Sequence, residues 1–157
     1  MAAVPGSLVI RRALNDDSRR EPLRSGPAPA FNLEATDGMM VSSARLAGRP
    51  AVVHFFASWC KPCLDEVSVL NAARRSHPDL ALVGVVVRDD PAEAGRAAQQ
   101  LGLDWPLLVD PDEEAARAYG VDSAPVTFFV SAQGEITGRL IGPVHRLPFD
   151  RQLRRIL

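Results

Sequence analysis

Cysteine, lysine and tyrosine are scarce in this chain of 157 residues, which has two cysteines, one lysine and one tyrosine. Two cysteines are too few for a fold that disulfides hold together. Charge of one sign is not in excess either, since 18 Lys and Arg residues stand against 19 Asp and Glu residues. A net charge of −1 predicts no affinity for nucleic acid or an anionic membrane surface. Long apolar runs are also lacking, because none reaches the roughly 18 residues of a membrane span.

The composition is that of a globular domain, with 46% hydrophobic and 24% charged residues. A chain of this length is expected to form one domain with a full core, and we expect a monomer. Residues 1–29 mix both charges and end in a stretch of small residues and prolines, so we interpret them as a flexible segment or linker. Residues 30–157 alternate strand and helix patterns, which predicts a single α/β domain.

The two cysteines stand three residues apart, as C-K-P-C at 60–63, directly after an apolar stretch. Residues 51–56 are β-branched and aromatic, which predicts a buried strand, and a short turn separates this strand from the first cysteine. Pro62 has a fixed φ and no N–H, so it suits the first turn of a helix. Cys60 is therefore predicted to lie at the positive end of a helix dipole.

A second apolar run, at residues 80–87, predicts another buried strand. Because a helix joins it to the first strand, we expect the two strands to pair in parallel within a central mixed sheet that has helices on both faces. The other predicted elements are a hairpin over 30–41, helices over 92–101 and 112–119, strands over 106–109, 126–130 and 135–141, and a C-terminal helix that begins near Pro148.

The chemistry of the cysteine pair follows from its place at the start of a helix. A thiolate, not a thiol, is the nucleophile, and the pKa of a free thiol, about 8.5, falls at a helix N-terminus within a CxxC motif. The cation of Lys61, the only lysine, is expected to favour the thiolate further. We infer that Cys60 attacks a disulfide of a partner and that Cys63, one turn deeper, resolves the mixed disulfide.

Two simpler interpretations of the cysteine pair are a structural disulfide and half of a zinc site. Zinc needs about four ligands. A second CxxC motif is absent, and the three histidines, His54, His77 and His145, have no ligand spacing. We therefore predict no metal site, and we favour the redox function because a CxxC motif within a βαβ pattern is typical of redox proteins.

From Pro29 to the end, the sequence resembles the TlpA/ResA branch of the thioredoxin superfamily, which includes the CcmG/DsbE-like reductases of cytochrome c maturation. Three features carry the resemblance: the hairpin pattern P-A-F-N-L-E-A-T-D-G, the motif W-C-K-P-C with Glu66 three residues after it, and a βα unit over 90–109 that simple thioredoxins lack. The resemblance implies a thioredoxin-like fold with an N-terminal β-hairpin and an added βα unit. It also implies a protein thiol–disulfide oxidoreductase, most often a reductase.

The resemblance further implies partners and a compartment. Proteins with disulfides or dithiols would be the substrates, and an upstream electron-donor protein would supply electrons. No bound cofactor would be needed beyond the Cys60–Cys63 disulfide. The compartment would be extracytoplasmic. However, the sequence has no signal pattern, so taken literally the chain would be cytoplasmic, unless it is a piece of a longer, anchored precursor.

Residue by residue, the resemblance implies supporting roles around the two cysteines. Ala124–Pro125 would be a cis peptide bond that faces the cysteines and docks an extended segment of the substrate by strand addition. Trp59 would shield the site, while Lys61 and Pro62 would influence its reduction potential. Asp89 would accept a proton from the resolving thiol or, in the simpler interpretation, cap the following helix.

Three positions depart from the family pattern, and one of them is Ser68, which replaces a helix-kinking proline. Thioredoxins have a buried aspartate six residues before the first cysteine, where this chain has His54. A strand histidine is most often a hydrogen-bonded core residue, but imidazole titrates near neutral pH, so His54 is also a candidate proton acceptor for Cys63. CcmG-like proteins commonly carry glutamate after the cis proline, where this chain has Val126, which weakens the case for apocytochrome c as the partner.

Two rival functions have specific signatures. Peroxiredoxins share the added βα unit, but they need a threonine three residues and a proline seven residues before the cysteine, where this chain has Ala57 and Val53. A copper(I) carrier would bind the ion through Cys60, Cys63 and a histidine such as His145, because soft thiolates suit that ion. We retain both as alternatives to the oxidoreductase.

Overall fold

The structure, a computed structural model, describes residues 20–157. A six-stranded sheet contains β1 (Gly26–Pro27), β4 (Ala51–Phe56), β5 (Ala81–Val86), β6 (Leu107–Leu108), β7 (Val126–Val130) and β8 (Glu135–Ile141). A separate hairpin consists of β2 (Asn32–Glu34) and β3 (Met40–Ser42). The helices are the 3-10 turn η1 (Ser43–Leu46), α2 (Lys61–Ser76), α3 (Pro91–Leu101), α4 (Glu114–Tyr119) and α5 (Arg146–Leu153). The elements predicted within residues 30–157 are therefore confirmed, with shifts of a few residues at their ends.

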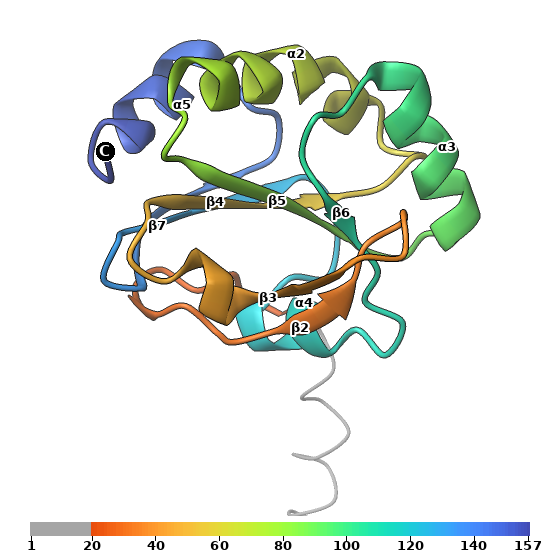
Figure 1. Cartoon of the computed structure of the whole chain (residues 1–157), viewed down its shortest axis with the longest axis horizontal. Helices are drawn as coiled ribbons and strands as arrows, with labels where there is room; N and C mark the ends of the chain where they lie inside the picture. Colours follow the sequence, from red (N-terminus) through yellow and green to blue (C-terminus); the bar gives the residue numbers. More distant parts are fainter. Residues whose placement is uncertain (1–19) are drawn as a thin grey trace, which may run out of the picture.

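The large sheet lies between two layers (Figure 1). Helices α2, α3 and α5 cover one face, and α4 lies with the β2–β3 hairpin on the other. The strand order is β1–β8–β7–β4–β5–β6, with β4 parallel to β5 and antiparallel to β7. The predicted mixed sheet with helices on both faces is thus confirmed. Within the part of the chain that the structure describes, no helix has the length and apolar character that a membrane crossing requires.

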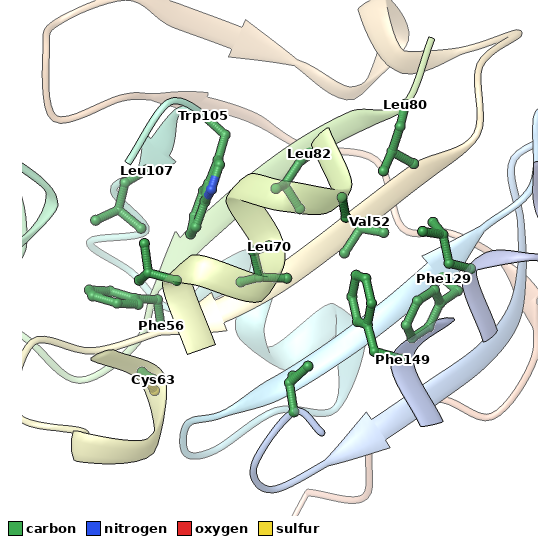
Figure 2. Packing of buried hydrophobic residues seen from close by; sticks show 14 of the residues in the cluster. Val52, Phe56, Cys63, Leu70, Leu80, Leu82, Trp105, Leu107, Phe129 and Phe149 are labelled. Atoms are coloured by element: carbon green, nitrogen blue, oxygen red, sulfur yellow. The ribbon is translucent and has the colours of Figure 1, made fainter. Parts of the chain in front are cut away.

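The central strand β4 is buried along its whole length because both of its faces meet a layer. Its side chains alternate between the faces, as they do on any strand. Val52 and Phe56 pack with Leu70 of α2 and Leu82 of β5 on one face, and Figure 2 shows these side chains between helix and sheet. Phe55 packs on the opposite face. His54 lies two positions from each of Val52 and Phe56, so its side chain also points toward α2.

The added βα unit is present as α3 followed by β6, which extends the sheet beside β5. Asp90 is the N-cap of α3, where its carboxylate accepts hydrogen bonds from the N–H groups of Ala92 and Glu93. Gly102 ends the helix in the left-handed conformation, with a φ of 64°. These signals are local in sequence, which is why the unit could be predicted.

The described structure begins earlier than the predicted domain boundary at residue 30. Residues 1–19 of the predicted linker lie outside the described residues, whereas residues 20–29 contact the domain. β1 pairs with β8, and the N–H of Leu23 donates to the carbonyl of Tyr119. Side chains add further contacts, since Arg20 pairs with Glu113 and Leu23 packs on the apolar cluster below the sheet. Because these partners lie far away in the chain, no local pattern in the sequence indicates the contacts. The C-terminal helix also begins earlier, at Arg146, because a proline at its third position loses only an N–H that the first turn leaves unpaired.

Candidate active site

Cys60 and Cys63 lie at the start of α2, directly beyond the end of β4. Cys60 is the N-cap residue, and its Sγ accepts a hydrogen bond from the N–H of Cys63 at 3.3 Å. The two residues form a disulfide, with their Cα atoms 5.3 Å apart. Pro62 stands in the first turn, as predicted. Cys60 exposes only 4% of its surface and Cys63 none, so a partner can reach the site only through Cys60.

The side chain of Lys61 does not point to the sulfur atoms. Its Nζ lies 3.2 Å from Oδ1 of Asp65, one turn along the exposed face of α2. An ion pair at this spacing is a common helix-surface contact, and it compensates the charge of the lysine. The predicted support of the thiolate by Lys61 is therefore weaker than the sequence alone indicates.

The loop before Cys60 is tied to the loop after β5 by two hydrogen bonds. The N–H of Ser58 donates to the carboxylate of Asp89 at 2.7 Å. The indole N–H of Trp59 donates to the carbonyl of Arg88 at 2.8 Å, and this tryptophan keeps 55% of its surface exposed at the edge of the site. The two acids of the loop have separate tasks, since Asp90 caps α3 and Asp89 holds the active-site loop.

The turn that enters β7 was predicted to take part in the site. Ala124–Pro125 is a cis peptide bond, as predicted. Ala124 packs against the apolar cluster that contains both cysteines. Its backbone N–H and carbonyl have no hydrogen-bond partner among residues 20–157. A groove of about 480 Å³ runs beside this turn, and its lining includes Pro125, Val126, Ile141 and Arg20.

Two titratable side chains meet under α2. His54 of β4 is fully buried, and Glu66 of α2 exposes 3% of its surface. Nε2 of His54 lies 3.5 Å from Oε2 of Glu66. The other ring nitrogen, Nδ1, lies 2.8 Å from Oγ1 of Thr127, and Oε1 of Glu66 accepts a hydrogen bond from the N–H of Val144 at 2.6 Å. The structure thus brings together two of the predicted supporting residues.

Burial moves the pKa values of the two groups in opposite directions. Loss of water lowers the pKa of His54 from 6.5 to about 4, because it penalises the cation. Loss of water raises the pKa of Glu66 from 4.5 to about 7, against the opposing effect of the Val144 N–H. The imidazole is therefore neutral at neutral pH. The member of the pair whose pKa lies near neutral pH is Glu66, so Glu66 rather than His54 changes protonation state there.

Three residues that shape the pocket around His54 were missed by the sequence analysis. Thr127 and Gly84 are its neighbours on the two adjacent strands. A Cβ on Gly84 would lie 2.6 Å from the ring of Trp105, whose ring centre lies 6.3 Å from that of His54 in an edge-on arrangement. Trp105 in turn donates to Asn71 of α2 at 2.9 Å. A glycine within a fully apolar strand indicates such a close approach, so one of the signals was present.

No group of three His, Cys, Asp or Glu side chains between residues 20 and 157 is arranged to hold a metal ion. His145, the ligand considered for copper(I), instead occupies the N-cap position of α5. The structure therefore gives no support to the copper-carrier alternative.

Comparison with known proteins identifies relatives of this fold and site. The model of the AhpC/TSA family matches residues 25–139. The thiol:disulfide interchange protein DsbE of Allochromatium vinosum is 32% identical over 139 residues, which cover 87% of this chain and 76% of that protein. The thiol-disulfide oxidoreductase ResA of Bacillus thuringiensis is 23% identical over 131 residues, with 82% and 76% covered. A solved thioredoxin-family thiol:disulfide interchange protein from Chlorobium tepidum is 29% identical, with a TM-score of 0.72 over 87% of this chain and 99% of that chain.

The fold and the site define a thioredoxin-like protein with a CxxC redox centre. The chain belongs to the AhpC/TSA family, and within it to the thiol–disulfide oxidoreductases that include DsbE and ResA. The predicted thioredoxin-like fold, the resemblance to the ResA and DsbE branch and the oxidoreductase class are therefore confirmed. The peroxidase alternative gains no better support, since Ala57 and Val53 still occupy the positions of its required threonine and proline.

Proposed function

We propose that this protein reduces disulfides of partner proteins, with Cys60 as the nucleophile and Cys63 as the resolving thiol. The Cys60 thiolate attacks one sulfur of the partner disulfide, a mixed disulfide forms, and the other partner sulfur leaves as a thiolate. Cys63 then attacks Cys60, and the second partner sulfur leaves. Two electrons pass to the partner, and the Cys60–Cys63 disulfide that results is reduced again by an upstream electron-donor protein. No bound cofactor takes part.

The observation that carries this proposal is the position of Cys60 at the N-cap of α2. The amide of Cys63 already donates to its sulfur, and the helix dipole adds positive potential at the same point. Both effects favour a negatively charged sulfur, which is the reactive form. Cys63 is the third residue of α2, is fully buried and is bonded to Cys60, which supports its role as the resolving thiol.

Docking of the partner is proposed for the turn at Ala124–Pro125. The N–H and carbonyl of Ala124, which have no partner within the described part of the chain, suit an extended segment that adds to the turn by backbone hydrogen bonds. The groove beside the turn would take side chains of that segment. We assign the protein to the reductases of the TlpA/ResA and cytochrome c maturation type and propose an extracytoplasmic location, with apocytochrome c disfavoured as substrate because Val126 replaces the family's glutamate.

Alkylation of the reduced protein tests the assignment of the two thiols. In the Cys63→Ser variant, Cys60 is expected to react with iodoacetamide at neutral pH at least about tenfold faster than an ordinary thiol with a pKa of about 8.5. In the matched Cys60→Ser variant, the buried Cys63 is expected to react more slowly than that reference. Equal reactivity of the two thiols, or no enhancement at Cys60, would contradict the proposal.

The reduction potential of the Cys60–Cys63 couple, measured by equilibration with glutathione, tests the direction of electron flow. A reductase is expected to lie near the potential of thioredoxin, about −270 mV. A value near that of the oxidant DsbA, about −120 mV, would reverse the assigned direction and leave the exchange chemistry intact.

A further inference from the structure

The two atoms through which His54 and Glu66 face one another have no hydrogen-bond partner among residues 20–157. These atoms, Oε2 of Glu66 and Nε2 of His54, are both buried. At 3.5 Å the two atoms form no regular hydrogen bond in this structure. Because an unpaired buried polar atom is costly, a small approach that lets them pair with one another is favoured. Only one proton fits between them.

The remaining atoms of the pair are held in place from two further elements. Thr127 of β7 holds Nδ1, and the N–H of Val144, just before α5, holds Oε1. Because Nε2 faces a carboxylate oxygen, we infer that Nε2 carries the ring proton and that Nδ1 accepts from the Thr127 hydroxyl. In this tautomer the imidazole, held by Thr127, presents its N–H on the side of the ring that faces Oε2.

Glu66 lies next to the resolving thiol on the buried face of α2. Residues three apart on a helix are neighbours, with Cβ atoms about 5–6 Å apart, and Cys63 and Glu66 have this spacing. Both are buried on the same helix. His54 points to the same side of the sheet as Val52 and Phe56, which share an apolar cluster with Cys63. The pair thus borders the layer in which the Cys63 thiol must lose its proton.

We propose that His54 is a positioning residue that holds the Glu66 carboxylate as the acceptor of the Cys63 proton. The inference rests on the proposed function, because it concerns the resolving step. In that step the Cys63 proton passes to Glu66, a bond forms between the two cysteine sulfurs, and the bond from Cys60 to the partner sulfur breaks. The partner sulfur leaves with the electron pair as a thiolate, so the cysteines are oxidised and the partner is reduced.

The charges around the pair agree with this role. On α2, the carboxylate of Asp65 raises the pKa of Glu66, while burial has the largest effect and brings that pKa to about 7. The groups that face His54 from the neighbouring elements are uncharged, namely Thr127 of β7 and the Trp105 ring. A carboxyl group that titrates near neutral pH is matched to the proton transfer that it would perform.

A two-phase reaction of the reduced protein separates the resolving step from the first attack. An aromatic disulfide reagent releases one coloured thiolate when Cys60 attacks and a second when Cys63 resolves, and only the first phase depends on reagent concentration. In the wild-type protein the second rate is expected to rise with pH and to level off above about pH 7. In Glu66→Gln it is expected to fall about 100-fold at neutral pH and to keep rising with pH, as an unassisted thiol would.

The His54 variants test positioning rather than packing alone. His54→Leu removes the donor to Oε2, so the midpoint of the second-phase profile is expected to move up by about one pH unit or more. His54→Gln retains an N–H donor, so its midpoint is expected to lie between those of the wild type and His54→Leu. Asp65→Asn is the matched control on α2, because it removes a neighbouring carboxylate that faces solvent. In Asp65→Asn the second rate should still level off with pH, with a midpoint at or slightly below that of the wild type because Asp65 raises the pKa of Glu66.

Each outcome bears on one of the two proposals. A wild-type protein without a fast first phase overturns the proposed function. A wild-type profile in Glu66→Gln, or any order of midpoints other than wild type, His54→Gln and then His54→Leu, overturns the role assigned to His54 and Glu66. If His54→Leu does not fold, as judged by circular dichroism, then Glu66→Gln and His54→Gln decide the question by the same criteria.

Discussion

The carboxylate of Asp89 accepts a hydrogen bond from the N–H of Ser58, 31 positions earlier in the chain, at a distance of 2.7 Å. This bond joins the loop after β5 to the loop that presents Cys60. Asp89, for which the sequence suggested either proton acceptance or capping of the following helix, therefore anchors the loop that leads to Cys60. Its neighbour Asp90 performs the capping of α3, so the two acids can be tested against each other.

Replacement of Asp89 by alanine is expected to lower the free energy of unfolding by about 1–2 kcal/mol, because a charged acceptor of a backbone N–H is lost. It is also expected to slow the alkylation of Cys60, since the loop before the cysteine loses its anchor. Asp90→Ala is the control, with a similar loss of about 1 kcal/mol from the missing N-cap and no change in the alkylation rate. Urea denaturation and iodoacetamide kinetics measure both effects. Identical alkylation rates in the two variants would show that Asp89 does not organise the loop.

A second prediction concerns the space that Gly84 leaves for Trp105. A Cβ at residue 84 would lie 2.6 Å from the tryptophan ring and 2.7 Å from Leu107, so Gly84→Ala forces the core apart and is expected to cost about 1–3 kcal/mol. Gly95→Ala is the control in α3, where the new Cβ would meet Thr36 at an ordinary 3.5 Å. Because alanine is the better helix former, Gly95→Ala is expected to gain about 0.5–1 kcal/mol. Urea denaturation that gave both variants the same sign would refute this account of the pocket.

The sequence predicts those features of the active site that depend on residues close together in the chain. The apolar strand at 51–56, the fixed φ of Pro62 and the spacing of the cysteines all act within a few residues, and the structure has β4 and α2 where they were expected. Tertiary contacts decide the rest. Lys61 turns to Asp65 because the start of α2 points its side chain into solvent, and no pattern in the sequence distinguishes that rotamer from one that faces the sulfur.

For Glu66, local signals predict that the side chain is buried, whereas tertiary contacts decide which groups it meets. Residues 63, 66, 67 and 70 follow the i, i+3, i+4, i+7 spacing of a buried helix face, so the sequence contained the signal that places this acid inside. Its partners could not be found in that way. His54 belongs to a strand, and Val144 lies 78 positions after Glu66. Only the packing of α2 on the sheet and next to the start of α5 brings these two partners to Glu66.

A third prediction follows from the position of Lys61. Because its Nζ is exposed and paired with Asp65, Lys61→Gln is expected to change the alkylation rate of Cys60 by less than about threefold, in keeping with the small energy of surface ion pairs. The comparison uses the reduced Cys63→Ser background at neutral pH. A decrease of tenfold or more would mean that the lysine turns to the sulfur in the reduced protein and would restore the role that the sequence suggested.

The last prediction concerns stability against pH in the oxidised protein. Folding lowers the pKa of His54 from 6.5 to about 4 and raises that of Glu66 from 4.5 to about 7. Between about pH 4.5 and pH 6.5 the unfolded chain holds one proton on the imidazole, and the folded protein holds one proton on the carboxyl. Because the number of bound protons is then equal in both states, the pair contributes almost no slope to the free energy of unfolding in this window.

The contributions of His54 and Glu66 to the pH dependence of stability cancel in the wild type, so a single substitution should reveal the contribution of the residue that remains. In His54→Gln, only Glu66 titrates, the folded state binds more protons, and stability is expected to fall as pH rises from about 4.5 to 7. In Glu66→Gln, only His54 titrates, the unfolded state binds more protons, and stability is expected to rise from about pH 4 to 6.5. Each slope is at most about 1.4 kcal/mol per pH unit, measured by urea denaturation relative to wild type so that other groups cancel. Slopes of the same sign in the two variants would mean that folding does not transfer a proton from His54 to Glu66, and parallel curves would mean that neither pKa shift is real.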